Sequence, residues 1–408
     1  MRALAHNYLF IFGLSLLVLF SIYVFNRSVK DNRINLLTTS FKSTDQNFSV
    51  NSYGKPKKVL QVASPFREPV TNRSYVILIW ISEKELVATF RSALKLDNFY
   101  MKGQFKNCNF NNCIITENIS RIHVSDALLI PYPELQTLPK ITQRPIGQIW
   151  VFWAKDGPFN PRQHLEWKSK RIISFFNWTV TYRKQSDIVY QGYGYAKKKA
   201  NLNGPPRQNE INFAIRKTRL VVWLVSNCQT KSRREKYVEL LQKYLPVDIV
   251  GKCNYSNTHI SECSTNFGPK CFNWISKQYK FLLSFETKIC KQYITDMFFY
   301  ALKQNIVPVL MSGKPELFEL PPKSFINIRD YQTPAKLARY LLLLDKNDYL
   351  YNQYFKWIDY YNIIGPTIQE HNYMCELCKR LNRQNIFRKM YFDLKRWWES
   401  NSCENPWW

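Results

Sequence analysis

The residues of this chain that could do chemistry gather where the pattern predicts that a strand ends and a helix begins. The stretch FETKICKQYITDMFFYALKQNIVPVLMSG, residues 285–313, predicts a turn, a helix from about Thr295 to Lys303, and a strand that ends in glycine. The free backbone N–H groups at the start of a helix favour an anion. Asp296 and Met297 open this helix, so a chain rich in lysine and arginine places no cation at the helix start.

Apolar runs bounded by polar residues predict the strands that position this stretch. The runs are residues 75–80, 148–153, 220–225, 247–250, 279–285 and 307–310. From Leu220 onward they alternate with amphipathic segments such as 234–244, a pattern typical of a doubly wound parallel sheet. Such sheets bind ligands at the carboxyl ends of their strands. Residues 331–350 and 351–361 predict helices packed against the sheet.

The composition indicates a globular protein with an anionic partner. The chain has 408 residues, enough for two domains of ordinary size, and 45% of them are hydrophobic. Lys and Arg number 58 against 30 Asp and Glu, a formal net charge of +28. This balance favours nucleic acid, a membrane surface, or a phosphorylated or acidic substrate. The basic runs are short and scattered, however, which favours solvated basic faces over one nucleic-acid patch.

The amino-terminal residues predict a membrane anchor. Residues 8–25 contain no charge and are close to the length needed to span a bilayer. No cleavage site like that of a signal peptide follows, so we expect an uncleaved signal anchor after a tail of residues 1–7. Residues 26–73, rich in Ser, Asn, Lys and Thr, read as a stem. The flanking charges by themselves place the long carboxyl-terminal part in the cytoplasm.

Cysteines and glycosylation sequons contradict that orientation. The chain has ten cysteines, and sequons occur at Asn47, Asn72, Asn118, Asn177 and Asn254. Together they favour an oxidising, glycosylating lumen, which also argues against nucleic acid as the partner. Asn177 also fits a packed loop residue. The disulfide pairing stays open, with Cys108 and Cys113 as the simplest local pair.

Three weaker patterns favour structural readings. Gly192-Tyr193-Gly194 lacks the third glycine of a dinucleotide fingerprint and predicts a turn. The pair Cys375-Glu-Leu-Cys378 has no second CxxC to complete a zinc site, which favours a structural disulfide over a redox or metal role. The five histidines are scattered, and no D-x-D is present. The sequence therefore implies a site without a metal.

Six segments in fixed order resemble the α1,3-fucosyltransferase family. They are residues 144–148, 176–187, 222–228, 247–253, 285–313 and 345–352. The resemblance covers about residues 75 to 403. It implies an α/β protein of GT-B architecture, with two Rossmann-like domains facing a cleft, anchored in the Golgi membrane as a single-pass type II protein with a lumenal catalytic part. It also implies GDP-fucose as donor and the 3-hydroxyl of N-acetylglucosamine in a glycan as acceptor.

The resemblance divides the chain and assigns its donor site. Residues 74–210 correspond to the acceptor-side domain, 211–360 to the GDP-fucose-binding domain, and 361–408 to a helical, disulfide-bonded segment. The donor-binding residues implied are Arg183, Ser226, Asn227, Arg234, Glu286, Tyr293 and Asp296, and we add Lys288 on its charge. An arginine can hold phosphate oxygens bidentately. Each assignment has a structural alternative. Arg234 is also consistent with an exposed helix arginine, in which case Arg233 is the alternative for its role. Ser226 and Asn227 are also consistent with a helix cap, and the Tyr182-Arg183 pair with support of a sheet.

The implied catalytic base is Asp156. The family places a glutamate in the segment that here reads Trp150-Val-Phe-Trp-Ala-Lys-Asp-Gly-Pro158. An inverting transfer requires a carboxylate that deprotonates the acceptor hydroxyl as it attacks. Aspartate is one methylene shorter but has a similar pKa. The alternative reading is a turn residue before Gly157.

The same family pattern shows departures at the helix start. Thr287, Asp296 and Met297 stand where the family has asparagine, glutamate and lysine. Losing one charge-assisted contact costs roughly 1.5–3 kcal/mol, or roughly 10- to 150-fold in affinity or rate. Lys288 and Lys291 are the candidates to replace the missing charge.

Three functional readings follow. The first is an active fucosyltransferase that needs no cofactor, with stimulation by a divalent cation left open. The second is a weakened or inactive homologue that binds glycans or a partner protein, and the third is an enzyme that uses another nucleotide sugar. The sequence does not distinguish the N-glycan core from an antenna or a Lewis-type acceptor.

Overall fold

The structure is a computed structural model. It describes residues 73–81, 105–106, 108–137, 144–158, 176–200, 211–253, 260–263, 267–314, 319–365, 373–383, 389–400 and 402–408. The predicted membrane span at 8–25 and nearly all of the predicted stem lie outside the described residues. Within these ranges, no helix is both long enough and apolar enough to cross a bilayer.

The amino-terminal half is built on a six-stranded sheet in which all neighbours are parallel. Its strands are β1 (Tyr75–Ile79), β2 (Cys113–Thr116), β3 (Ala127–Pro131), β4 (Ile149–Ala154), β5 (Trp178–Thr181) and β6 (Ile188–Val189). Their order is β2-β1-β3-β4-β5-β6. The short helices η2 (Ile119–Arg121) and η3 (Tyr132–Gln136) connect them.

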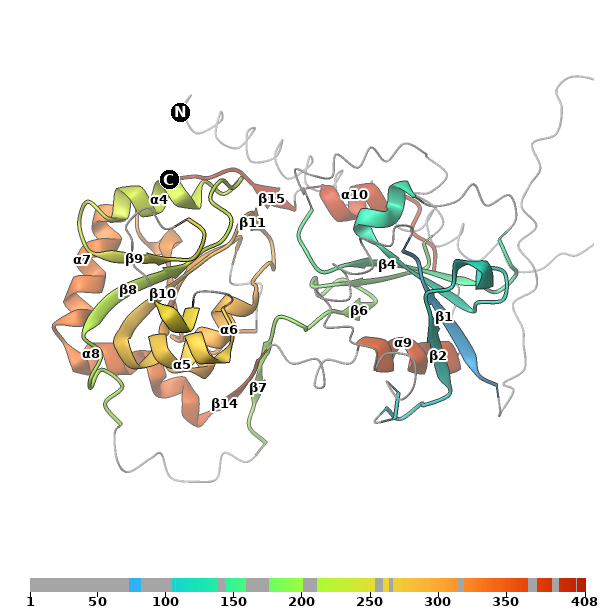
Figure 1. Ribbon diagram of the computed structural model, residues 1–408, viewed down its shortest axis with the longest axis horizontal. Helices are drawn as coiled ribbons and strands as arrows, with labels where there is room; N and C mark the ends of the chain where they lie inside the picture. Colours follow the sequence, from blue (N-terminus) through green and yellow to red (C-terminus); the bar gives the residue numbers. More distant parts are fainter. Residues whose placement is uncertain are drawn as a thin grey trace, which may run out of the picture. The chain divides into compact units, whose positions relative to one another are not determined.

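The carboxyl-terminal half has a second parallel sheet with helices on both faces (Figure 1). Its strands β8 (Arg219–Leu224), β9 (Val247–Val250), β10 (Tyr279–Phe285), β12 (Val307–Met311) and β13 (Ile326–Asn327) follow the order β13-β12-β10-β8-β9. The helices are α4 (Arg234–Leu241), η4 (Ser261–Cys263), α5 (Pro269–Gln278), α6 (Asp296–Lys303), η6 (Ile328–Asp330), α7 (Pro334–Asp345), α8 (Asp348–Asn352) and η7 (Gln353–Asp359).

Alternation along the central strands explains the two helical layers of this half. In β8, Val221 and Trp223 face the core formed with α4, α7 and α8, whereas Val222 and Leu224 face the core formed with α5 and α6. Strand residues that alternate in direction and are apolar on both sides must be covered on both faces. The predicted doubly wound parallel sheet is therefore confirmed.

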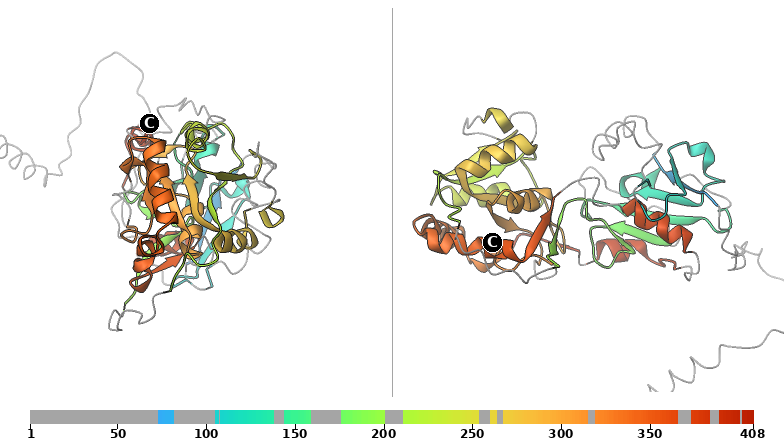
Figure 2. Two further views of the ribbon diagram at one scale, coloured as in Figure 1. Left: turned by 90° about the vertical axis from the view of Figure 1, so that its left-hand side faces the viewer. Right: turned by 90° about the horizontal axis from the view of Figure 1, so that it is seen from below.

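The carboxyl-terminal segment returns to the amino-terminal half. Helix α9 (Tyr373–Asn382) buries Leu377 and Leu381 against one face of the first sheet. Helix α10 (Leu394–Glu399) buries Leu394 and Trp398 against the other face. In Figures 1 and 2 these two helices appear in red beside the blue and green strands of the amino-terminal half. The last part of the chain thus completes the first sheet.

Two small antiparallel pairs link distant segments. β11 (Ile289–Cys290) pairs with β15 (Cys403–Glu404), and β7 (Tyr195–Lys198) pairs with β14 (Tyr361–Ile364). The sequence predicts residues 351–361 as a helix, and the chain is helical as far as Asp359, through the end of α8 and the 3₁₀ helix η7 (Gln353–Asp359). The prediction is wrong at Tyr361, where β14 begins because this segment pairs with β7.

All ten cysteines form disulfides, in a pairing that corrects the predicted local pair. Cys108 bonds Cys375 and Cys113 bonds Cys378, so the first two cysteines do not bond each other. The remaining pairs are Cys228–Cys253, Cys263–Cys271 and Cys290–Cys403. The predicted structural role of the CxxC pair is confirmed, but its partners lie at the start of the first sheet because α9 packs there.

The sequon residue Asn177 is packed in the interior of the protein. Its side chain is 4% exposed, accepts hydrogen bonds from Trp150 N and Arg144, and donates to Lys389 O. The reading of Asn177 as a packed loop residue is confirmed. Asn118, by contrast, is exposed and caps η2.

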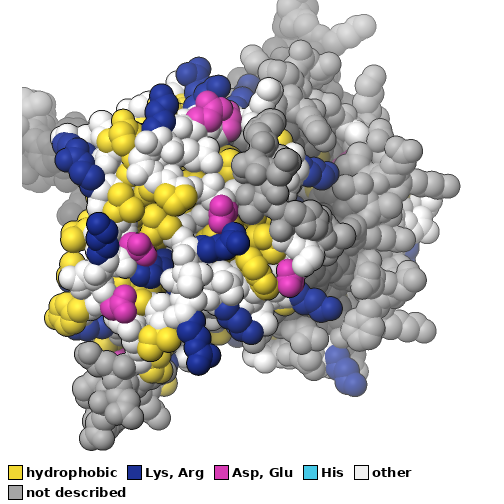
Figure 3. Space-filling model, turned by 60° about the vertical axis from the view of Figure 1, so that its left-hand side comes forward, with side chains coloured by type: hydrophobic (Ala, Val, Ile, Leu, Met, Phe, Trp, Pro, Cys, Tyr) yellow, Lys and Arg dark blue, Asp and Glu magenta, His cyan; other side chains and the backbone are white. Residues whose placement is uncertain are grey.

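The basic side chains do not gather into one patch on the face drawn in Figure 3. Lys and Arg lie there among acidic, apolar and uncharged polar groups. This dispersion agrees with the predicted solvated basic faces, at least on that side of the molecule.

The two disulfides that fasten α9 predict non-additive stability. They close nearly the same loop, with sequence separations of 267 and 265 residues. Replacing either pair by serine leaves the other to close the long loop, so each loss should cost about 2–3 kcal/mol in the loop-entropy model. Removing both should cost more than the sum. Denaturant midpoints under non-reducing conditions measure this, and strictly additive losses would contradict it.

Candidate active site

The strand order reverses between β8 and β10, and the predicted anion-binding residues lie there. Ser226 and Asn227 follow the end of β8 and are exposed, while Glu286 follows β10 directly. In the sheet, β9 lies on one side of β8 and β10 on the other. Parallel sheets leave a crevice for ligands at the carboxyl ends of strands where the order switches.

Arg234 lies at this switch point. It is the first residue of α4, and its guanidinium donates to Asn227 O at 3.2 Å and to Phe285 O. These carbonyls lie next to the ends of β8 and β10, so the side chain bridges both strands. Arg233 is exposed, in a left-handed conformation (φ 50°). Of the two arginines, Arg234 is therefore the one whose guanidinium lies at the strand ends.

Arg234 carries its charge into a largely buried position. Burial lowers the pKa of its guanidinium, and the nearby Glu286 carboxylate opposes that shift. Its Nε atom has no hydrogen-bond partner among the described residues. Arginine stays protonated at any physiological pH, so the site keeps a positive charge at the strand ends.

Glu286 holds the start of α6. Its Oε1 accepts from Thr295 N at 2.8 Å and from Thr295 Oγ1 at 3.0 Å. Burial raises the pKa of Glu286 to about 7, although the bonds from Thr295 and the charge of Arg234 lower it. The prediction of α6 from about Thr295 is confirmed, with Asp296 as its first residue. Glu286 is thus placed to position the helix.

Lys288 reaches from the loop after β10 to the amino-terminal half. Its Nζ donates to Gly157 O at 3.0 Å, next to Asp156. Burial lowers the pKa of Lys288 to about 8; the Asp156 charge opposes that shift and the Lys231 charge adds to it. The ammonium is still mostly protonated at neutral pH. A cation therefore lies between the predicted base and the predicted anion site.

Asp156 follows β4 and is exposed, with two tyrosines around its carboxylate. Tyr193 donates to Asp156 Oδ1 at 2.9 Å, and Tyr293 donates to the same atom at 3.5 Å. Burial raises the pKa of both phenols well above the ordinary value, and the Asp156 charge adds to the rise. Both therefore stay protonated and orient the carboxylate by donating to it.

Tyr193 was missed by sequence reasoning, which predicts only a turn at Gly192-Tyr193-Gly194. The turn is present. Gly194 has φ +121°, and a Cβ there would lie 2.5 Å from the Phe299 ring. The glycine thus permits close packing on α6 while Tyr193 points to Asp156. The sequence shows a tyrosine between two glycines, but it does not show that this tyrosine contacts Asp156.

The predicted donor-binding role of Arg183 is not supported by its contacts. The guanidinium donates to Trp397 O at 2.7 Å and also to Trp398 O and Ser402 Oγ. It lies 4.5 Å from the centre of the Trp398 ring. Its neighbour Tyr182 is buried against Trp398. The alternative reading, support of the sheet, is the one observed, because the carboxyl-terminal segment returns to this place.

The remaining residues of the helix start divide between core and surface. Met297 packs against the core cluster formed by α5 and β8, so an apolar side chain lies where the resemblance implies a lysine. Lys291 is exposed, while its backbone N–H donates to Ser402 O. Of the two candidate replacement charges, Lys288 is the one that the structure brings to Asp156.

Gly313 allows the loop that carries Lys288 to approach β12. A Cβ at this position would lie 2.3 Å from Cys290 O and 2.7 Å from Lys291 N, both backbone atoms. Gly313→Ala should therefore destabilise the protein by about 3 kcal/mol. Gly365→Ala is the control, since its Cβ would meet only the end of the flexible Lys303 side chain at 3.3 Å. Equal melting temperatures of the two variants would contradict the tight approach.

The described ranges hold no group of three or more His, Cys, Asp or Glu side chains arranged to hold a metal ion. The chemical groups at the site are one exposed carboxylate, two protonated phenols, one lysine and one arginine beside the start of a helix. This arrangement can bind an anion and remove a proton from a hydroxyl group.

Two protein-family descriptions together match most of the chain. The description "Fucosyltransferase, N-terminal" matches residues 72–194, and "Glycosyltransferase family 10 (fucosyltransferase) C-term" matches residues 214–397. The fold is that of an α/β protein, with a buried arginine at the switch point of a parallel sheet. The chain belongs to glycosyltransferase family 10, the fucosyltransferases, as the resemblance predicts.

Curated relatives share about a third of their aligned residues with this chain. Glycoprotein 3-alpha-L-fucosyltransferase A of Drosophila melanogaster is 34% identical over 300 residues, covering 71% of this chain and 55% of the relative. The fucosyltransferase FUT3 of Bos taurus is 34% identical, over 60% of this chain and 64% of the relative. The FUT3 of Pongo pygmaeus is 31% identical, over 68% and 70%. The chain thus spans less than two thirds of the first two.

A solved α1,3-fucosyltransferase with GDP-fucose is 14% identical, with a TM-score of 0.47, over 81% of this chain and 97% of that one.

Proposed function

We propose that this protein transfers fucose from GDP-fucose to the 3-hydroxyl of N-acetylglucosamine in a glycan, with inversion at the sugar carbon. The observation that carries the proposal is the contact of Lys288 Nζ with Gly157 O, 3.0 Å apart and beside Asp156. It brings a cation next to an exposed carboxylate, and family membership supports the substrate class. The two parallel sheets support a GT-B architecture with two Rossmann-like domains.

In this proposal Asp156 is the general base. The acceptor oxygen attacks C1 of fucose, the bond from C1 to the β-phosphate oxygen breaks, and the acceptor proton passes to Asp156 Oδ2. Tyr193 and Tyr293 donate to Oδ1, which leaves the other oxygen for the acceptor. A base within hydrogen-bond reach of the proton is the geometric requirement. GDP leaves with both electrons of the broken bond.

Cations stabilise the negative charge that develops on GDP. Arg234 lies at the ends of β8 and β10, and Lys288 lies between this place and Asp156. The start of α6, fixed by Glu286, adds backbone N–H groups and the positive end of a helix dipole. Ser226 and Asn227, exposed at the same strand ends, line the nucleotide site in this proposal. Lys288 replaces the charge that Met297 lacks.

The proposed setting is the Golgi lumen. A single-pass type II anchor at residues 8–25 agrees with the uncharged run in the sequence, and ten cysteines, all in disulfides, agree with an oxidising compartment. The acceptor is a glycoprotein or glycolipid glycan. A divalent cation could stimulate the reaction without a dedicated protein site.

Asp156→Asn should abolish transfer and keep the donor site. The amide accepts the hydrogen bond of Tyr193 but cannot take a proton, so we expect a loss of at least about 100-fold in the transfer rate. GDP affinity, measured by calorimetry, should change little. The control is Glu239→Gln, which removes an exposed carboxylate of α4 and should keep full transfer. Full transfer by Asp156→Asn would exclude it as the base.

The Lys288 charge predicts a pH dependence of donor binding. The pKa of about 8 means that the ammonium is charged below that value and loses its proton above it. GDP affinity should therefore fall roughly 10-fold or more between pH 7 and pH 9.5. Bound phosphate will move the midpoint upward, because an anion favours the charged form.

Lys288→Met separates this effect from other titrations. The variant should bind GDP weakly at pH 7 and show a flat profile, while Lys291→Met, which removes an exposed lysine of the same loop, should keep the wild-type slope. Identical slopes in wild type and Lys288→Met would show that another group controls binding.

Met297 in the core cluster favours a second candidate, a weakened homologue. The family lysine is absent there and no cation occupies its place on the helix. GDP binding without transfer to N-acetyllactosamine or N-glycan acceptors would support this reading. Binding of another nucleotide in place of GDP would instead support a different donor sugar.

A further inference from the structure

A pocket lies at the edge of the carboxyl-terminal sheet, apart from the candidate active site. Its volume is about 680 Å³, within the usual range for small-ligand sites. It is formed around the two-residue edge strand β13, by the segment before this strand, by α7, and by the junction of α8 with η7. The lining residues are Leu320, Pro321, Pro322, Lys323, Phe325, Asn327, Asp330, Tyr340, Leu350, Gln353 and Tyr354.

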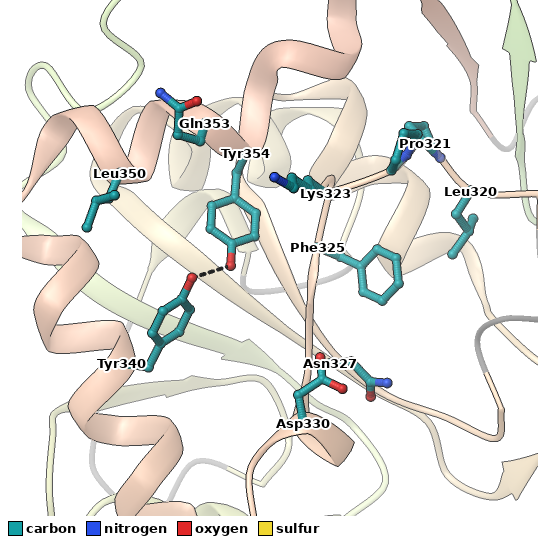
Figure 4. A pocket seen from close by; sticks show the side chains of 11 residues that line it. Leu320, Pro321, Lys323, Phe325, Asn327, Asp330, Tyr340, Leu350, Gln353 and Tyr354 are labelled. Atoms are coloured by element: carbon teal, nitrogen blue, oxygen red, sulfur yellow. Dashed lines mark hydrogen bonds between the residues drawn. The ribbon is translucent and has the colours of Figure 1, made fainter.

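The walls are aromatic and come from two separate cores. Tyr340 and Tyr354 pack against the core on one face of the sheet, and Phe325 packs against the core on the other face. Figure 4 shows the two tyrosines pointing toward each other and Phe325 away from them, across the strand. Because β13 is so short, the sheet ends here and leaves a hollow between these layers. Ring faces of this kind contact the C–H faces of sugar rings.

The polar groups at the pocket have unused hydrogen-bonding capacity. The hydroxyl groups of Tyr340 and Tyr354 bond each other at 2.8 Å, which uses one of their two protons. Asn327 Oδ1 accepts from Arg329 N, and its Nδ2 donates to no other described residue. The Asp330 carboxylate accepts no hydrogen bond from the described part of the chain. Donors and acceptors for vicinal hydroxyls thus lie close together (Figure 4).

The charge of the lining argues against an anionic ligand. It contains one lysine, Lys323, and one carboxylate, Asp330. In a chain with a formal charge of +28 this pocket is formally neutral. A nucleotide or phosphate would meet the Asp330 carboxylate without an arginine to hold it. A purely apolar ligand would leave the carboxylate and amide without partners. A neutral, polyhydroxylated ligand fits both requirements.

The pocket shares no residue with the proposed transfer site. Asp156, Lys288 and Arg234 are absent from its lining. Its Leu350 belongs to segment 345–352, which resembles the fucosyltransferase family but has no part in the proposed chemistry. The site therefore needs its own explanation.

We propose that this pocket is a second carbohydrate site, which binds a neutral pyranose residue of an oligosaccharide without reacting with it. The sugar ring lies against the aromatic walls, with its hydroxyls bonded to Asp330 and Asn327. Holding a distant residue of a large glycan would raise the local concentration of the rest of that glycan at the protein. Binding is measurable without transfer, so this inference and the proposed activity can fail independently.

Photoaffinity labelling of the full-length protein tests the proposal. The probe is a methyl N-acetyllactosaminide that carries a diazirine, used with saturating GDP, and the labelled peptides are mapped by mass spectrometry. We expect label on peptides that contain Phe325 or Tyr354, competed by unmodified N-acetyllactosamine and by a mannose-rich N-glycan. Label confined to peptides around Asp156 would overturn the proposal.

Matched variants give the second arm of the test. Asp330→Asn removes an exposed carboxylate and should lower pocket labelling and glycan affinity roughly 5- to 10-fold. Tyr354→Leu should do the same through the lost ring. The controls are Glu239→Gln, in an exposed pair on α4, and Tyr349→Leu, whose side chain is 65% exposed.

Melting temperatures show whether each variant is folded. If Asp330→Asn and the controls melt alike and label alike, the carbohydrate site is excluded. Displacement of the glycan by a proline-rich peptide at lower concentration than by any sugar would identify a peptide groove and overturn the proposal as well.

Discussion

The return of the carboxyl-terminal segment is the constraint on which the rest of the structure depends. Helices α9 and α10 cover opposite faces of the first sheet, and the Cys290–Cys403 disulfide then joins this segment to the loop that carries Lys288. A Cβ on Gly157 would lie 3.2 Å from Cys290 Sγ. The turn that bears Asp156 therefore packs directly on this disulfide. Burial of α9, α10 and Arg183 fixes the first sheet, which carries Asp156. The Cys290–Cys403 disulfide fixes the loop that carries Lys288.

The buried charges at the site offset part of each other's desolvation cost. Glu286 and Arg234 are both largely buried, and each lowers the charging cost of the other. Lys288 lies close to Asp156 and Lys231, with a pKa lowered to about 8. Partly desolvated cations such as Arg234 and Lys288 are stabilised by a nearby anion, and a pyrophosphate carries two negative charges. In the proposed function, this stabilisation is the physical basis for placing the donor there, although Met297 offers no cation at the helix start.

Much of the carboxyl-terminal half could be predicted from sequence because its strands are continuous apolar runs. Strand β10 and helix α6 lie where the pattern places them, since an apolar run and the periodic apolar residues of a helix are both local signals. The amino-terminal half was less predictable. Strands β2 and β6 have four and two residues, which is too few to show a periodicity. The sequences of α9 and α10 do not indicate which sheet these helices cover.

The sequence by itself determined the family, the alternation of strands and helices, and the carboxylate and cations available for chemistry, because residue types and local spacing carry this information. Only the tertiary structure decided which of them meet. Arg234 rather than Arg233 faces the strand ends, and Lys288 rather than Lys291 reaches Gly157. The guanidinium of Arg183 bonds the carboxyl-terminal segment. Tyr193 acquires its role from packing on α6. These choices depend on long-range packing and on disulfides between segments more than 260 residues apart, which no local pattern encodes.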